Sequence, residues 1–464
     1  MTEQDVATGS QQRPLLTGLN QRGFRLVMVA DAMALLTIAI VSMIVRFGLD
    51  WPNYPIPLYL VSFATTTAIF VGAFYFGGLY EREPRLGAPP VLPRAAGLSL
   101  GAGGLVALLT LGLSGVARVA GWTTDRVLPF PITNLVIVIV LGAVAVAVNR
   151  WLVHRLRTRR EGAPRILIIG SPEELATAQK HLTASHAPAE VVGQLEHARE
   201  VLDEVHATGA TDVVLLSRHW LDPLYPEVIE RLEQEGRTVL LRVTARETMF
   251  GLERIREVGG LPFVLLRSQT VPRSRARFKR VTDLTITLLA APIWLPVLGA
   301  VALYQLLVAG RPLLYWQERV GEGGRTFRLV KFRTMTPDAE ADGRGARLAE
   351  EDDPRIIPAC RWIRASRLDE LPQMWNVLRG EMALVGPRPE RPELTHEFER
   401  RIPGYRRRHE LPPGLTGLAQ IHGRYHTDAE YKLGYDIQYL VNWSPVLDIE
   451  ILARTIWVVL TRRI

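Results

Sequence analysis

Four long apolar stretches near the start of the chain limit most strongly what it can fold into. Each holds about 20 mostly hydrophobic residues with almost no charge, the length needed to cross the hydrocarbon core of a bilayer. The first stretch lacks the short apolar core and the small-residue cleavage site of a signal peptide, so we expect it to be retained. We therefore predict an integral membrane protein whose helices cross at 26–45, 58–79, 95–119 and 132–148.

Basic residues beside these stretches predict their orientation. Arginines precede the first stretch, lie between the second and the third, and follow the fourth, whereas the segment 50–55 carries none. Because cytoplasmic loops of membrane proteins are enriched in Lys and Arg, we expect both ends of this bundle on the cytoplasmic side. Asp31 lies inside the first stretch, where a charge is costly; it either has a function or pairs with an arginine near the interface.

From Arg165 the pattern changes to short apolar strands separated by polar helical segments. Strands are predicted at 166–169, 211–216 and 238–243, and this alternation favours a small parallel α/β domain of a degenerate Rossmann-like kind. The segment 170–174 lacks two glycines of the dinucleotide fingerprint, and its two glutamates would repel a pyrophosphate. We therefore expect a regulatory or assembly role here rather than a bound dinucleotide.

A fifth apolar run, 281–308, has basic residues on both sides. A crossing would place the arginine-rich remainder of the chain outside the cell, against the charge rule. Pro292 and Pro296 lie near the middle of the run, where each removes a backbone donor and favours a bend. We predict a re-entrant hairpin that enters and leaves on the cytoplasmic face, broken at these two prolines; a straight fifth span is the alternative.

The last third of the chain concentrates cations that suit a phosphate ester. Arginine matches phosphate oxygens with two parallel hydrogen bonds, so Arg333, Arg364 and Arg388 are candidates to hold a diphosphate. Arg319 and Lys331 add positive charge beside apolar anchors. The chain as a whole carries 55 Lys and Arg against 47 Asp and Glu, a net charge of +8, which agrees with anionic partners.

Two adjacent carboxylates, Asp369 and Glu370, lie a few residues after Arg364. They could hold Mg²⁺, which usually takes one or two protein carboxylates together with substrate phosphates. One of them could also act as a nucleophile. An N-capping aspartate within a solvated ion-pair face is the alternative for such a pair.

The order of the motifs in 279–464 resembles the catalytic domain of bacterial sugar transferases, the monotopic polyprenyl-phosphate hexose-1-phosphate transferases. Ala419 departs from the tryptophan that many members have after the Gly-Leu or Gly-Ile pair. The four-helix start and the α/β middle are similar to the large members, which initiate exopolysaccharide, capsule or O-antigen repeat units. The motifs that carry the resemblance are 317–321, 331–335, 368–373 with 375–378, 384–390, 413–418, and a last motif made of positions 435–436, 443–444 and 448.

This resemblance implies transfer of a sugar 1-phosphate from a UDP-hexose, with glucose or galactose expected, to undecaprenyl phosphate, with release of UMP. It also implies Asp369 as the nucleophile that forms a covalent phosphosugar intermediate, Glu370 as its dyad partner, and Mg²⁺ as the cofactor. The alternative is a catalytically silent membrane scaffold for polysaccharide assembly, against which the intact Asp369–Glu370 pair with Arg364 and Arg388 argues.

The expected organisation follows from these parts. Residues 1–160 form a four-helix transmembrane bundle, 161–270 the Rossmann-like domain, and 271–464 the re-entrant helix and an α/β-type catalytic domain. We expect a multi-pass protein of the bacterial inner membrane with the catalytic domain on its cytoplasmic face. The expected partners are a UDP-sugar, undecaprenyl phosphate and the lipid bilayer, not nucleic acid; a homo-oligomer such as a dimer is left open.

Overall fold

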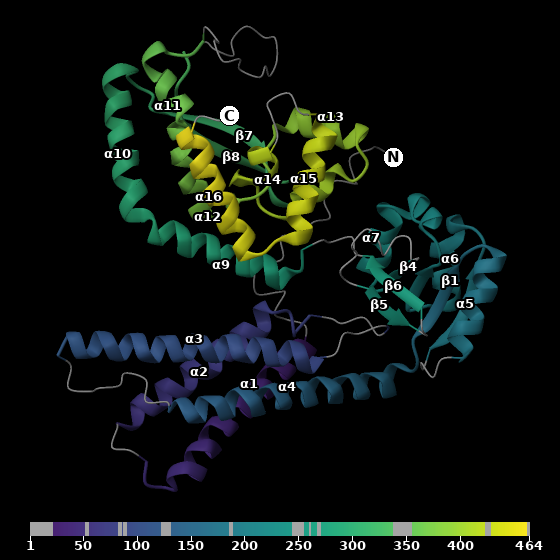
Figure 1. The fold of residues 1–464 in the computed structure, drawn as a ribbon. Helices are drawn as coiled ribbons and strands as arrows, with labels where there is room; N and C mark the ends of the chain where they lie inside the picture. The colour runs from purple at the N-terminus through teal and green to yellow at the C-terminus, as the bar shows by residue number, and fades with distance from the viewer. Residues whose placement is uncertain are drawn as a thin grey trace, which may run out of the picture. The chain divides into compact units, whose positions relative to one another are not determined.

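The computed structural model describes residues 22–51, 55–81, 86, 91–121, 131–184, 189–243, 255–258, 261–266, 271–336, 355–422 and 428–461. They fall into two compact units, Met1–Arg267 and Ser268–Ile464. The first unit begins with four long helices: α1 (Arg22–Phe47), α2 (Ile56–Phe76), α3 (Val91–Val119) and α4 (Ile132–Glu161) (Figure 1).

These four helices contain most of the four predicted stretches. Their shared core is built from aromatic and aliphatic side chains, among them Leu35, Phe70 and Val138. Their outward faces expose large apolar side chains such as Val45 and Leu108, as lipid-facing helices do. Among the described residues, five helices are long and apolar enough to cross a membrane: α1 to α4 and, in the second unit, α10 (Ala291–Val308).

Asp31 pairs with two side chains of α4. Its Oδ2 lies 2.5 Å from Arg150 Nη2, and its Oδ1 accepts a hydrogen bond of 2.6 Å from Asn149 Nδ2. Arg150 also donates to the Leu79 carbonyl from Nε, at 3.1 Å. A buried carboxylate must be paired to be tolerated, so Asp31 ties α1 to α4 and its interpretation as the partner of an arginine is confirmed.

The first unit continues with a six-stranded sheet in the order β2-β1-β3-β4-β6-β5, counted over the described residues. The first four strands in this order are parallel, as predicted, whereas β6 pairs antiparallel with β4 and with β5. The sheet therefore ends in a hairpin that the sequence analysis did not predict. Its elements are β1 (Arg165–Ile169), α5 (Pro172–Ala184), β2 (Glu190–Leu195), η2 (Ala198–Glu200), α6 (Val201–Thr208), β3 (Asp212–Leu215), η3 (Arg218–Trp220), η4 (Asp222–Leu224), α7 (Glu227–Gln234), β4 (Thr238–Arg242), β5 (Ile255–Val258) and β6 (Leu261–Leu266).

The start of α5, where a dinucleotide would bind, is capped by its own side chains. Glu174 Oε2 accepts a hydrogen bond of 2.8 Å from the Ser171 amide, and Ser171 Oγ accepts one of 3.4 Å from the Glu174 amide. This reciprocal pair is a capping box, and it places a carboxylate where a pyrophosphate would need free amides. The arrangement agrees with the expectation that this domain does not hold a dinucleotide.

The second unit surrounds two small strand pairs with helices (Figure 1). β7 and β8 pair antiparallel, and β9 and β10 pair parallel. The strands are β7 (Leu314–Val320), β8 (Thr326–Phe332), β9 (Ala383–Val385) and β10 (Gly414–Thr416). The helices are α9 (Arg273–Leu289), α10, η5 (Glu322–Gly324), η6 (Pro358–Cys360), α11 (Arg361–Ala365), η7 (Leu368–Gln373), α12 (Met374–Arg379), α13 (Pro392–Arg401), η8 (Tyr405–Glu410), α14 (Leu418–His422), α15 (Ala429–Asn442) and α16 (Pro445–Thr461).

The apolar run 281–308 is bent, but the bend lies earlier than predicted. α9 ends at Leu289 and α10 begins at Ala291, so the break falls at Ala290 (Figure 1). Pro292 is the second residue of α10, where a missing amide hydrogen does no harm. The prediction that Pro296 also breaks the run is wrong, because α10 continues through it.

Side chains rather than proline support this bend. Trp294 Nε1 donates a hydrogen bond of 3.0 Å to the Thr287 carbonyl across it. From there α10 runs back to the rest of the unit, where Tyr304 donates to the Ala359 carbonyl at 3.1 Å. The two helices diverge from the bend instead of lying side by side as a closed hairpin (Figure 1).

Candidate active site

A short 3-10 helix, η7, carries the two predicted carboxylates. Arg367, just before it, has a φ of 58°, the one positive value at a non-glycine residue among those described. This left-handed conformation costs about 1 kcal/mol, and such strain is concentrated at functional sites. η7 packs against β8 and α10, and Leu368 contacts the apolar cluster that includes Phe332. Asp369 and Glu370 are consequently only 7% and 9% exposed.

Glu370 is held by cations from three different parts of the second unit. Within the described residues, its Oε1 lies 3.4 Å from Lys331 Nζ, 3.4 Å from Arg388 Nη2 and 3.6 Å from Arg367 Nη1. Burial by itself would raise the pKa of Glu370, but the positive charges of Lys331, Arg388 and Arg367 outweigh it and lower the pKa to about 2. Glu370 is therefore an ionised anchor that gathers these cations.

Asp369 lies in a different environment from its neighbour. Its Oδ1 is buried and accepts no hydrogen bond from the described residues. Burial, and then the negative charge of Glu370, raise the pKa of Asp369 to about 6, although Lys331 and Arg364 act in the opposite direction. A buried carboxylate oxygen without a partner beside several cations has the features of a nucleophile toward an anionic phosphorus centre.

The structure thus brings together five of the predicted site cations and carboxylates and adds one. Lys331, from β8, is partly buried, and desolvation is the main cause that lowers its pKa. Arg364, from α11, lies close enough for its charge to lower the pKa of Asp369. Arg367 was not among the predicted site residues, although its position three residues before Glu370 is a spacing that places two side chains on one face of a helical turn.

Arg333 and Arg319 lie outside this group and contact backbone carbonyls. The buried Arg333 donates from Nε to the Pro312 carbonyl at 2.7 Å and from Nη2 to the Ala309 carbonyl at 2.6 Å, and so caps the end of α10. Arg319 donates from Nη1 to the Pro389 carbonyl at 3.0 Å. We therefore do not place either side chain among the phosphate ligands.

Three glycines allow the backbone beside the site to come together. The Gly386 amide donates to the Thr416 carbonyl at 2.8 Å, directly after the β9–β10 pair. A Cβ atom on Gly414 would lie 2.1 Å from the Gly386 nitrogen, and one on Gly417 would lie 2.1 Å from the Gly386 oxygen. Because no side chain fits at these distances, the motifs 384–390 and 413–418 need glycine here, and Arg388 is presented from this junction.

The residues that could hold a metal are the two carboxylates. In the described ranges, no group of three or more His, Cys, Asp and Glu side chains is placed to bind an ion by itself. Lys331, Arg364, Arg367 and Arg388 already outnumber Asp369 and Glu370 around the site. This excess of positive charge disfavours an ion held by protein groups alone, so a metal here would need substrate phosphates as further ligands.

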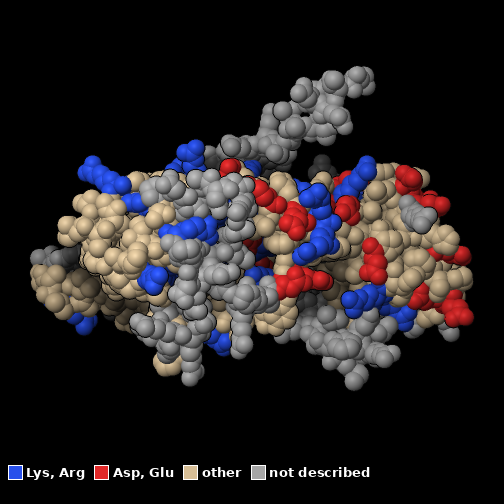
Figure 2. All heavy atoms as spheres, turned by 90° about the horizontal axis from the view of Figure 1, so that it is seen from above, with Lys and Arg blue, Asp and Glu red and all other residues tan. Residues whose placement is uncertain are grey.

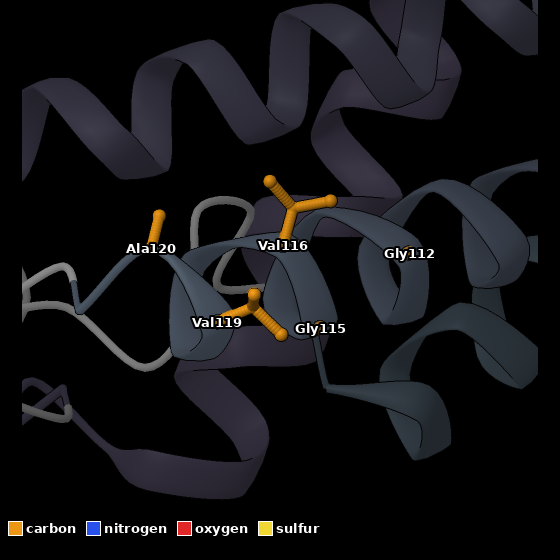
Figure 3. Close-up of a pocket in the computed structure, with 5 residues that line it drawn as sticks. All are labelled: Gly112, Gly115, Val116, Val119 and Ala120. Atoms are coloured by element: carbon orange, nitrogen blue, oxygen red, sulfur yellow. The ribbon is translucent and has the colours of Figure 1, made fainter.

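Two other surface features do not compete with this site. A hollow on α3 is lined by Gly112, Gly115, Val116, Val119 and Ala120, which offer no charged group to a phosphate (Figure 3). On the face drawn in Figure 2, acidic side chains lie among basic ones in the centre and at the right, so the net charge of +8 does not make this face uniformly positive. The cations around Glu370 are therefore a local concentration of charge.

Comparison with known proteins agrees with the arrangement of the second unit. Residues 274–462 match the family model described as bacterial sugar transferase. A UDP-N-acetylgalactosamine-undecaprenyl-phosphate N-acetylgalactosaminephosphotransferase of Aeromonas hydrophila is 40% identical over 189 residues, which are 40% of this chain and 44% of that protein. A UDP-galactose-lipid carrier transferase of Erwinia amylovora is 38% identical over 213 residues, 43% of this chain and 44% of the relative.

A shorter relative shows the family membership most directly. A UDP-glucose:undecaprenyl-phosphate glucose-1-phosphate transferase of Caulobacter vibrioides is 39% identical over 188 residues, which are 39% of this chain and 70% of that protein. This chain spans less than half the length of the Aeromonas and Erwinia relatives that it matches. The motifs that surround Asp369 and Glu370 all lie within the matched residues 274–462. The chain therefore belongs to the bacterial sugar transferase family.

Proposed function

We propose that this protein transfers a sugar 1-phosphate from a UDP-sugar to undecaprenyl phosphate, releases UMP, and so initiates a polysaccharide repeat unit. The observation that carries this proposal is the buried Asp369 oxygen, which accepts no hydrogen bond from the described part of the chain, next to a Glu370 carboxylate that gathers cations. The relatives named above are described by their transfer of sugar phosphates to a lipid carrier, which supports the same class of acceptor.

In this mechanism Asp369 attacks the phosphorus atom that carries the sugar. The bond between that phosphorus and the bridging oxygen breaks, and UMP leaves with the electron pair. A phosphate oxygen of undecaprenyl phosphate then attacks the same phosphorus and displaces the Asp369 carboxylate. The covalent step allows UMP to leave before the second anionic substrate arrives, which avoids having both anions in the site together.

Cations around the site offset the charge that this reaction develops. Lys331 and Arg388, held on Glu370, together with Arg364 and Arg367, are preorganised and stabilise the phosphoryl oxygens without reorganisation. We infer that Asp369 and Glu370 hold Mg²⁺ together with the phosphates of the donor. When bound, this ion would supply further neutralisation of phosphate charge.

The catalytic unit should meet the membrane through the bend between α9 and α10. Apolar side chains at the bend face outward: Leu288, Leu289 and Ile293 are 61%, 76% and 74% exposed. Basic residues flank the run on both sides. We infer that the bend enters the bilayer and returns to the same face, which keeps the site at the cytoplasmic surface of the inner membrane beside the lipid phosphate.

A panel of UDP-sugars in sealed membrane vesicles tests both the reaction and the side of the membrane on which the active site lies. The named relatives differ in their sugars, so UDP-glucose, UDP-galactose and their 2-acetamido forms are all needed. With undecaprenyl phosphate present, inside-out vesicles should release UMP from at least one of them, and right-side-out vesicles should release it only after permeabilisation. No UMP from any sugar would favour the alternative of a silent scaffold, and release by intact right-side-out vesicles would contradict the cytoplasmic site.

The pKa of Asp369 predicts the pH dependence of the first chemical step. A raised pKa means that the carboxyl group is protonated, and not nucleophilic, below about pH 6. The rate of UMP release in a single turnover should therefore fall as the pH is lowered through the acid range, by at most about tenfold for each unit. Rapid-quench measurements between pH 5 and 8, with the unfolding temperature checked at each pH, decide this; an unchanged rate at pH 5 would argue against Asp369 as nucleophile.

A further inference from the structure

The loop that presents Arg388 is fixed through its backbone. Two of the four residues in this loop, 387–390, are prolines and have no amide hydrogen, so its carbonyls are important for holding it. Each of these carbonyls accepts a hydrogen bond: Pro387 from the Gly414 amide at 2.9 Å, Arg388 from Arg408 Nη2 at 3.0 Å, Pro389 from Arg319 Nη1 at 3.0 Å, and Glu390 from the Val320 amide at 3.0 Å. The donors come from three different elements, β7, η8 and β10, so the loop's position is determined by the tertiary fold.

Arg408, in η8, is the buried arginine of this set. Its Nη2, which donates to the Arg388 carbonyl, also lies 2.8 Å from Asp436 Oδ2 on α15, and its Nη1 donates to the Tyr405 hydroxyl. Arg408 and Asp436 are both almost completely buried. A buried ion pair is a poor source of stability, because desolvation costs about as much as the attraction returns. Its presence beside the Arg388 loop therefore calls for another reason.

The position of Arg388 explains why this buried ion pair is present. Its backbone carbonyl is bound by Arg408, and its guanidinium lies 3.4 Å from Glu370 Oε1. Asp436 belongs to the motif 435–448, to which the proposed reaction assigns no chemical step. A shift of the Arg388 backbone would move its guanidinium from both Glu370 and the donor diphosphate, and misplacement by about 1 Å can lower a rate about 100-fold.

We propose that Arg408, oriented by Asp436 and assisted by Arg319, is a positioning residue that acts on the donor diphosphate through Arg388. This rests on the proposed function, because it assigns Arg388 to the diphosphate of a UDP-sugar. Arg408 meets the reaction only through the Arg388 carbonyl. Lysine at this position would keep the charge that Asp436 needs but would lose the planar fork that also reaches Arg388 and Tyr405.

The test is a double-mutant cycle between Arg408 and Arg388. Arg408→Lys in the full-length protein should lower kcat/KM for the UDP-sugar by about 10- to 100-fold. In an Arg388→Ala background the same change should cost less than about threefold, since the guanidinium that Arg408 positions is already gone. Equilibrium binding of UDP to the same four proteins should show the same coupling. Arg406→Lys, a matched change at an exposed arginine of η8, should leave turnover unchanged.

Asp436→Asn provides a second test of the positioning role, because it keeps Arg408 and removes only the charge that orients it. It should reproduce the loss of kcat/KM, again only while Arg388 is present. Equal factors in both backgrounds, or losses of activity that merely follow lower unfolding temperatures in both variants, would overturn the proposal. A wild-type protein that binds UDP but releases no UMP would refute the proposed function. In that case the coupling between Arg408 and Arg388 can still be measured from UDP binding. A wild type that does not bind UDP would refute both.

Discussion

Asparagine in place of Asp369 should abolish UMP release and leave the protein folded. The amide keeps the shape of the side chain but removes the nucleophilic oxygen anion, and loss of such a group lowers turnover by about 10⁴-fold or more. Burial of the Asp369 charge is unfavourable, as the raised pKa of this carboxyl shows. Asp369→Asn should therefore unfold at the same temperature as the wild type or at a higher one.

The measurement uses purified protein and a UDP-sugar labelled in its sugar, without lipid acceptor. The wild type should release about one equivalent of UMP and retain the label on the protein, and Asp369→Asn should do neither. Asp428→Asn is the matched control, because it makes the same chemical change at an exposed helix cap where asparagine serves as well as aspartate. Label on the Asp369→Asn protein, or turnover near that of the wild type, would rule out Asp369 as the covalent residue.

Loss of Lys279 should have the largest effect on stability. Lys279 is 2% exposed, and its Nζ lies 3.0 Å from Asp448 and 3.3 Å from Asp283. Asp448 also accepts hydrogen bonds from the Tyr439 hydroxyl at 2.7 Å and from Trp443 Nε1 at 3.0 Å, so this cluster joins α9 to α15 and α16. Lys279→Met would leave two buried carboxylates without a cation, and breaking a buried pair in this way costs about 3–5 kcal/mol.

Thermal unfolding in detergent should show the transition of the second unit about 10 °C lower in Lys279→Met than in the wild type. Adding Asp448→Asn should recover part of the loss, since it removes one of the unpaired charges. Arg454→Met is the matched control, because Arg454 and Glu450 form an exposed pair on α16 that is worth at most about 1 kcal/mol. An unfolding temperature for Lys279→Met within 2–3 °C of the control would show that the cluster is not a major anchor of α9.

The sequence by itself determined the features that depend on neighbouring residues. Hydrophobic length identified α1 to α4, because each spanning stretch satisfies its own backbone hydrogen bonds and needs no partner to be recognised. The alternation of short apolar strands with polar helical segments predicted the parallel part of the sheet, whereas the β5–β6 hairpin was not predicted. The Asp369–Glu370 pair was recognised from a contiguous motif that lies within the matched family region.

Tertiary structure alone decided what each cation does. Lys331 and Arg333 are two residues apart, yet the first reaches Glu370 and the second caps α10, because β8 ends between them. Arg388 meets Glu370 while Arg319 holds the loop that carries it. Any of these side chains suits a phosphate chemically, and only long-range packing selects among them.

The position of the bend in the apolar run 281–308 was likewise decided by the tertiary structure and not by the local sequence. Prolines mark where backbone donors are missing, but a helix tolerates proline in its first turn, so Pro292 lies in the first turn of α10 and the break falls at Ala290. Trp294 supports the bend through a hydrogen bond across it. Local sequence thus determines which segments are apolar, helical or motif-bearing, because these properties arise from near neighbours. Where a helix breaks and which arginine faces the substrate depend on contacts between residues far apart in the chain, and those exist only once the chain has folded.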